Sequence, residues 1–292
     1  MQQDLQFMKF HIVLLTSLLV TGYAHGNVTG TAGGNPVTST RSASSNAVEK
    51  LTELAKSGNA EAQYELGRKY FTGAGVPLDR KKAQELYAAA AVQGNDKAEY
   101  EVARYYKGVT GQAFDLGKHF QYLKQSSEHG NTVAQSELAF LYLNGNGIVA
   151  KDLASSFRWF DTAAKGGSIV SQCMLGDFYK GGLGGVKQDY AQAFRWYRQT
   201  ATTKDKCAPK SQYELYASYE AGHGVKKSLP EAVRWLKRAA EAGNPTAQAT
   251  LGRAYRDGYG VPRDADLAKL WLKKSREGVA PHDDEDDHDH AH

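Results

Sequence analysis

The stretch that decides the fold of this 292-residue chain is NAEAQYELGRKYFTGAGV, residues 59–76. It recurs near the end of the chain as NPTAQATLGRAYRDGYGV, residues 244–261. Intermediate copies begin near Asn95, Asn131, Ser168 and Ala208, at spacings of about 36 to 40 residues, which makes six copies. Self-similarity at a fixed period of this length is typical of repeat proteins, in which similar units stack one after another.

Each copy is expected to form two helices. Ala62, Leu66 and Tyr70 stand four residues apart and therefore share one helix face. The Gly-x-Gly turn that follows ends the first helix, because Gly accepts the left-handed conformation that a helix C-terminus needs. An acidic residue then begins the second helix as an N-cap or first-turn acid; these residues are Asp79, Asp115, Asp152, Asp189 and Asp264. One hairpin cannot bury its apolar face alone, so the copies are expected to stack into an all-α fold, a right-handed α-solenoid.

The full pattern of one copy is A-x-x-x-L-G-x-x-Y-x-x-G-x-G-V-x-x-D-x-x-x-A-x-x-W-x-x-x-A-A-x-x-G. This pattern resembles the Sel-one-like repeat, a relative of the tetratricopeptide repeat, and the resemblance covers residues 59–279. We expect the repeat solenoid to occupy residues 46–279, because residues 46–58 look like the second helix of an incomplete copy and so like an N-terminal cap. Copy two departs most from the pattern, with Ala103 in place of the Gly.

The N-terminus is typical of a secretory signal peptide, expected over residues 1–26, with Met8 as an alternative start. Lys9 precedes an apolar run at residues 12–20, and Ala24 and Gly26 fit a cleavage site. The run is too short to span a bilayer as a helix, and no cysteine follows it to carry a lipid. These features predict a periplasmic protein without a lipid anchor or a membrane span. Residues 27–45 show no apolar periodicity and are expected to form a flexible leader.

The composition indicates a folded chain with a basic body and an acidic end. Hydrophobic residues make up 41% and charged residues 23% of the chain, and two cysteines exclude a disulfide-stapled miniature scaffold. The formal net charge is +4, but it is +10 without residues 280–292, which contain six acids and no Lys or Arg. This tail is predicted to be disordered. Two alternatives remain: His288, His290 and His292 bind zinc, copper or nickel, or the acids lie on the basic body.

The motifs of catalysis are absent from the sequence. It has no phosphate-binding loop, no G-x-S-x-G and no H-E-x-x-H, and His119, His129 and His223 are isolated along the chain. We therefore predict no enzyme activity and no cofactor.

Cys173 and Cys207 lie near the two ends of copy four, at the same end of its hairpin, where an exported protein can form a disulfide. The alternative is that Cys173 faces inward and holds the two sulfurs too far apart.

The first helices are expected to line a concave face that binds a protein partner. The side chains predicted to point into it are Glu61, Tyr64, Arg68, Phe71, Lys97, Tyr100, Arg104, Lys107, Val133, Ser136, Phe140, Leu143, Arg253 and Arg256. Aromatic residues beside Arg are typical of interface hot spots. The alternative for any one of these Tyr and Phe rings is that it packs between repeats. Nucleic acid is not an expected partner, because export separates the chain from it.

The resemblance to the Sel-one-like repeat family implies a non-enzymatic, protein-binding scaffold. Members of the family act in polysaccharide export, envelope and flagellar assembly and host-cell interaction, and others are immunity proteins that neutralise lipase effectors of type VI secretion systems. A small, exported, unanchored chain best fits an immunity protein, whose partner is a secreted effector enzyme with an acidic face. An assembly factor or a host-interaction protein is the alternative. A metal-handling protein that uses the tail, or a hydrolase, is a more distant one.

Overall fold

A computed structural model describes residues 37–108 and 114–277, with side chains from residue 46 onward. The chain divides into two compact units, residues 1–45 and 46–292, and all the helix pairs belong to the second. The predicted signal peptide, the first part of the predicted leader and the acidic tail with His288, His290 and His292 lie outside the described residues.

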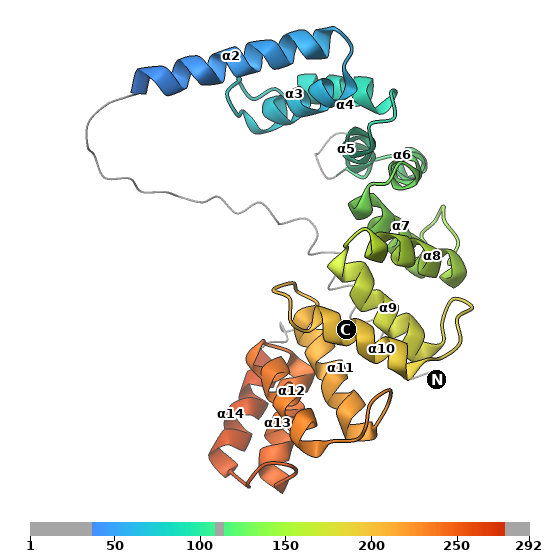
Figure 1. The fold of residues 1–292 in the computed structure, drawn as a ribbon, viewed down its shortest axis with the longest axis vertical. Coiled ribbons are helices and arrows are strands. Elements are labelled where there is room, and N and C mark those ends of the chain that lie inside the picture. Colours follow the sequence, from blue (N-terminus) through green and yellow to red (C-terminus); the bar gives the residue numbers. More distant parts are fainter. Residues whose placement is uncertain (1–36, 109–113, 278–292) are drawn as a thin grey trace, which may run out of the picture. The chain divides into compact units, whose positions relative to one another are not determined.

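The described residues form thirteen α-helices, shown in Figure 1, and one isolated bridge between Lys107 and Phe114. The helices are α2 (Val37–Lys56), α3 (Ala60–Thr72), α4 (Arg80–Ala91), α5 (Asp96–Tyr106), α6 (Leu116–Glu128), α7 (Thr132–Asn144), α8 (Leu153–Lys165), α9 (Ile169–Gly181), α10 (Tyr190–Thr200), α11 (Ala208–Ala221), α12 (Leu229–Glu241), α13 (Pro245–Asp257) and α14 (Ala265–Glu277). The prediction of an all-α solenoid of helix-turn-helix repeats is confirmed.

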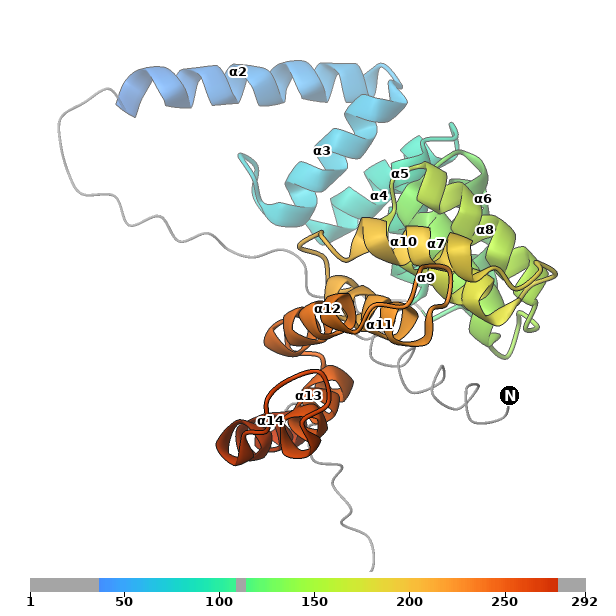
Figure 2. The same ribbon diagram turned by 60° about the horizontal axis from the view of Figure 1, so that its bottom comes forward.

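Neighbouring helices in the chain are neighbours in space. From α3 onward, each first helix packs on the second helix of its own pair, and each second helix also contacts the first helix of the next pair (Figures 1 and 2). Because every pair rests on its sequence neighbours, the stack is held together by nearest-neighbour contacts.

Local capping chemistry sets the helix starts. The first helices α3, α5, α7 and α13 each begin after an Asn whose side chain accepts a backbone N–H, as Asn59 does from Ala62 at 2.8 Å. The predicted acids cap the second helices in the same way: Asp79 accepts from the amide of Lys82 at 2.9 Å, and Asp264 from that of Leu267 at 2.9 Å. These bonds satisfy amides that have no partner inside the helix.

Two glycines of the first copy have the roles that the pattern predicts. Gly73 ends α3 in the left-handed conformation, with φ of 73°. Gly67 lies where α4 crosses α3, and a Cβ added there would meet the Tyr87 ring at 2.8 Å and the Ala83 carbonyl oxygen at 3.3 Å. Tyr87 is 2% exposed, so its ring fills the space that the missing side chain leaves.

The start of α2 differs from the prediction. The helix begins at Val37, so residues 37–45, which we expected in a flexible leader, are helical. The reason is local, because residues 37–45 contain no Gly or Pro that would interrupt a helix continuing from residue 46.

Candidate functional site

The first-helix face, defined here by the residues predicted above to bind a partner, carries polar contacts that join one copy to the next. The Lys97 ammonium donates to Glu61 Oε1 at 2.9 Å, and Asn95 Nδ2 donates to Glu61 Oε2 at 2.8 Å. The hydrogen bond from Lys97 lowers the pKa of Glu61, and the same bond raises the pKa of Lys97. Both side chains are exposed and already neutralise one another, so this part of the face presents little net charge.

Tyr64 is the aromatic centre of the face in copy one. Its half-buried ring lies between two cations, with the Arg68 guanidinium carbon 5.9 Å and the Lys97 ammonium 5.5 Å from the ring centroid. Arg68 also donates to Glu65 at 3.2 Å. Burial raises the pKa of Tyr64, so its hydroxyl is a donor at neutral pH. An amphipathic ring edged by positive charge is a surface that suits a protein partner.

In copies two and three the face centres on Glu137, which the sequence reasoning missed. The Tyr100 hydroxyl donates to Glu137 Oε2 at 3.1 Å, the Lys107 ammonium donates to Glu137 Oε1, and Nε2 of the buried His119 lies 3.9 Å from the same oxygen. Burial, together with the Glu137 charge, raises the pKa of Tyr100. The sequence does contain a pattern that points to Glu137. A Glu stands immediately before the apolar residue of the first helix in three successive copies, as Glu65, Glu101 and Glu137.

The prediction that Phe140 lies on the binding face is wrong. Phe140 is 4% exposed and packs edge-to-face on Phe160 of α8, with ring centroids 4.9 Å apart. Ser136 and Leu143 are also buried, whereas Val133 is 50% exposed. Arg68 occupies the position equivalent to Phe140 in copy one and reaches solvent. An aromatic ring at that position packs inward instead, because burial removes its apolar area from water.

The remaining predicted residues are exposed or half-buried and have partners within the chain. Arg104 donates to Glu101 at 2.9 Å, Arg253 donates to Thr250 at 3.1 Å, and Arg256 pairs with Asp257 at 2.8 Å. Phe71 is half-buried, with the Arg80 guanidinium 5.9 Å from its ring centroid. A partner that uses these arginines must therefore compete with bonds that already exist.

The two cysteines are buried, unpaired by a disulfide, and close together. Cys173, in α9, is 0% exposed and Cys207, before α11, is 2% exposed. The interaction of the two neighbouring side chains lowers the pKa of Cys173 and raises that of Cys207. Cys173 Sγ also lies 3.5 Å from Ser211 Oγ. Both thiols are free, so the disulfide and the alternative in which the sulfurs stay apart both remain predictions.

A polar network borders the thiols on the same junction. Lys210 of α11 donates to Asp177 of α9, and the Tyr197 hydroxyl donates to Asp177 Oδ1 at 2.8 Å. Burial opposes the charge of Lys210, but the attraction and hydrogen bond of Asp177, together with Cys173 and Glu214, outweigh it and raise the pKa of that lysine. Since Cys173 has no exposed surface, a substrate in solution does not reach its sulfur, and the cluster joins copies four and five.

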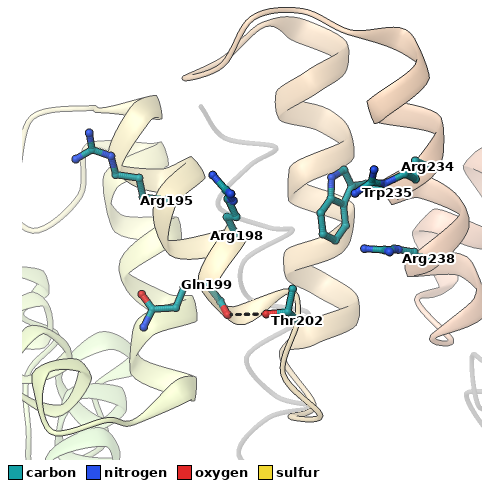
Figure 3. Close-up of a pocket in the computed structure, with 7 residues that line it drawn as sticks. All are labelled: Arg195, Arg198, Gln199, Thr202, Arg234, Trp235 and Arg238. Atoms are coloured by element: carbon teal, nitrogen blue, oxygen red, sulfur yellow. Dashed lines mark hydrogen bonds between the residues drawn. The ribbon is translucent and has the colours of Figure 1, made fainter.

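A second surface, absent from the sequence predictions, lies on the second helices α10 and α12. It is an open groove of about 540 Å³ whose lining includes Arg195, Arg198, Arg234, Trp235 and Arg238 (Figure 3). We call it the arginine groove. The Arg238 guanidinium carbon lies 4.9 Å and that of Arg234 5.8 Å from the Trp235 ring centroid.

The sequence contained a signal for the arginine groove as well. An Arg-Trp pair recurs at the same position of three second helices, as Arg158-Trp159, Arg195-Trp196 and Arg234-Trp235. It was passed over because binding was assigned to the first helices alone.

Within residues 46–108 and 114–277, no group of three or more His, Cys, Asp or Glu could hold a metal ion. Among the described helices, none is both long and apolar enough to cross a bilayer.

This chain is similar to several solved structures. A protective antigen of uropathogenic Escherichia coli is 33% identical, with a TM-score of 0.67 over 79% of this chain, which spans about half (48%) of that protein's length. A Sel1 repeat protein from Oxalobacter formigenes is 27% identical over 81% of this chain and 95% of its own, with a TM-score of 0.62. An immunity protein of Pseudomonas aeruginosa is 18% identical over 75% of this chain and 81% of its own, with a TM-score of 0.40.

The comparison with the curated proteins found no match. The family model of the Sel1 repeat matches five segments, residues 60–95, 132–168, 169–202, 209–244 and 245–278. The segment it leaves out between them holds α5 and α6, the copy in which Ala103 replaces the Gly. That copy packs on its neighbours like the others, since α4 contacts α5 and α6 contacts α7. With more than half of the chain matched and six such helix pairs stacked in order, this chain belongs to the Sel1 repeat family.

Proposed function

We propose that this chain is a non-enzymatic scaffold that binds a protein partner through its first-helix face. The observation that carries the proposal is the Tyr64 ring, half-buried between the Arg68 and Lys97 cations on a surface continuous with copy two. A held ring of this kind loses little conformational freedom when a partner covers it, so burial of its apolar area contributes to affinity.

A stacked array offers such a face over several copies. Contacts from copy to copy, such as Glu61 with Lys97 and Tyr100 with Glu137, hold these side chains in place before a partner arrives. Preorganisation of this kind lowers the entropy cost of binding.

Within this class we propose a periplasmic immunity protein whose partner is a secreted effector enzyme, a lipase of a type VI secretion system. The proposal rests on the signal-like N-terminal sequence, the resemblance to the repeat family and the +10 charge of the body without its tail, which favours a partner with an acidic face. An envelope or polysaccharide assembly factor remains the alternative, and it predicts a captured partner without hydrolytic activity.

The test begins with capture of periplasmic proteins on the immobilised chain, followed by binding kinetics with the identified partner. Tyr64→Ala is expected to weaken binding by about 30-fold, which corresponds to about 2 kcal/mol for a hot spot. The matched control is Tyr259→Ala, which removes an exposed tyrosine from the turn after α13, and it is expected to change binding by less than about twofold. Equal binding by Tyr64→Ala and the parent, with both folded, overturns the first-helix face as the site.

The finer proposal has its own measurement. If the captured partner is a lipase, adding the chain in equal molar amount is expected to abolish its hydrolysis of a phospholipid substrate, and Tyr64→Ala is expected to restore hydrolysis. A captured protein without such activity contradicts the immunity function and leaves the scaffold function standing.

A further inference from the structure

The arginine groove contains cations that nothing in the described chain neutralises. The guanidinium groups of Arg195, Arg198 and Arg238 make no hydrogen bond or ion pair with any described side chain, and only Arg234 has a carboxylate partner, Glu231 at 3.3 Å. This differs from the first-helix face, where Arg104 and Arg256 each pair with an acid. Unpaired guanidinium groups that line one groove repel one another, so an anion placed between them is stabilised.

The shape of the groove favours an extended anionic segment. Trp235 is 7% exposed and forms an apolar wall, with the arginines of α12 beside its ring and Arg198 across the groove on α10 (Figure 3). An apolar wall weakens screening by water and so strengthens the attraction of nearby cations for a carboxylate. Guanidinium groups bind carboxylates through two parallel hydrogen bonds, and separate arginines can each take a separate carboxylate.

The chain itself contains a segment of matching charge. Residues 283–289 read DDEDDHD and hold six carboxylates, and residues 278–292 contain no Lys or Arg that would oppose the groove. A segment with several adjacent carboxylates matches a groove with several guanidinium groups better than a single small anion does.

The acidic segment is also within reach. Arg198 lies in the last turn of α10 and Arg238 in the last turn of α12, and α14, the next second helix, ends at Glu277. The helices α12, α13 and α14 pack in turn, which puts α14 roughly 20 Å from α12 at usual packing distances. Five residues separate Glu277 from Asp283, so the stretch from residue 278 to residue 289 spans up to roughly 40 Å when extended.

We propose that the arginine groove binds the chain's own acidic segment, residues 283–289. The segment neutralises the groove in the free protein and leaves it when a more strongly anionic surface takes its place. The groove is thus an acidic-peptide site on the second helices, separate from the first-helix face, and its test does not depend on the partner proposed above.

The experiment uses the full chain and a fluorescein-labelled synthetic peptide of residues 281–292, with fluorescence anisotropy as the readout at low salt. In the parent, the attached tail competes at an effective concentration of about 1 mM, typical of a short flexible linker. A neutral-tail variant, in which Asp283, Asp284, Asp286 and Asp287 become Asn, is therefore expected to bind the labelled peptide at least about tenfold more tightly than the parent.

Two pairs of substitutions in the neutral-tail background test the location. Arg198→Gln with Arg238→Gln is expected to weaken peptide binding at least about tenfold. The control, Lys81→Gln with Lys124→Gln, removes the same charge from exposed positions of α4 and α6, and it is expected to change binding by less than about twofold. Equal losses in the two pairs mean general attraction to a basic body and overturn the groove as the site. Equal peptide binding by the parent and the neutral-tail variant overturns the chain's own tail as the occupant.

Discussion

The close approach at Gly67 gives the sharpest test of the packing. A Cβ at this position would lie 2.8 Å and 2.9 Å from two carbons of the Tyr87 ring and 3.3 Å from the Ala83 carbonyl oxygen. Tyr87 is 2% exposed and the oxygen belongs to the backbone, so neither can move away without opening the contact between α3 and α4. Overpacking of this kind costs about 1–3 kcal/mol.

The expected magnitude depends on the side chain introduced. For Gly67→Ala, an overpacking cost of about 2 kcal/mol is offset by about 1 kcal/mol of helix propensity, which leaves a net loss of about 1 kcal/mol. Gly67→Val adds two methyl groups and a β-branch, so we expect a loss of about 3 kcal/mol. For a chain of this size each kcal/mol lowers the thermal midpoint by about 2–4 °C.

Urea and thermal unfolding of purified variants measure these losses. The control is Gly117→Ala, an exposed glycine in the first turn of α6, where we expect unchanged or slightly higher stability. The cause is tested by repeating Gly67→Ala in a Tyr87→Leu background, where removal of the ring should abolish most of the penalty. A Gly67→Ala variant as stable as Gly117→Ala, or a penalty unchanged by Tyr87→Leu, would refute the assigned contact.

Three other predictions follow from contacts described above. A hydrogen bond with Glu99 raises the pKa of His129 above its usual 6.5, so the pair stabilises the fold below about pH 6.5 and less as pH rises through the raised pKa; thermal midpoints from pH 5.5 to 8.5 should fall less steeply in His129→Gln, and equal slopes contradict this. Refolding in excess oxidised glutathione, which reaches both thiols only in the unfolded chain, should join Cys173 to Cys207 by disulfide exchange, with two glutathione thiols released and a gain of about 3 kcal/mol; two thiols still titratable after a second denaturation contradict it. Glu137→Gln should lower the free energy of unfolding by about 1–3 kcal/mol in urea titration, because it weakens contacts with several donors; an unchanged urea midpoint contradicts it.

Much of the fold is predictable from the sequence because its determinants are local. The Asn and Asp caps act within three residues of their own position, and Gly73 adopts its left-handed conformation whatever packs nearby. The early start of α2 was missed because polar residues 37–45 lack the apolar periodicity on which the prediction relied.

The candidate site was less predictable, because exposure depends on the neighbouring copy as well as on the position within a repeat. Phe140 and Arg68 occupy equivalent positions, yet one ring is buried on Phe160 and the other side chain reaches solvent. His129 is isolated along the sequence, but its ring lies 2.8 Å from the Glu99 carboxylate, which is itself buried. These two pairs join residues 20 and 30 positions apart, and the spacing of residues along one helix does not reveal them.

The charge pattern of the structure separates two properties that the sequence reasoning had placed on one surface. We expected a basic, aromatic face of first helices to supply both affinity and electrostatic attraction. On that face Glu61 neutralises Lys97, and Glu137 neutralises Lys107. The face therefore keeps its aromatic rings, but these ion pairs cancel much of its positive charge. Within the described part of the chain, arginines without a carboxylate partner gather instead at the arginine groove, where only Arg234 has one. The rate at which a charged partner associates depends on the net electrostatic field of the surface, whereas affinity depends largely on buried, well-packed side chains. Added salt should therefore slow association at the second helices more than at the first helices. An acidic partner can therefore be attracted by one surface and held by the other, and an acidic tail in the groove would control the first of these steps.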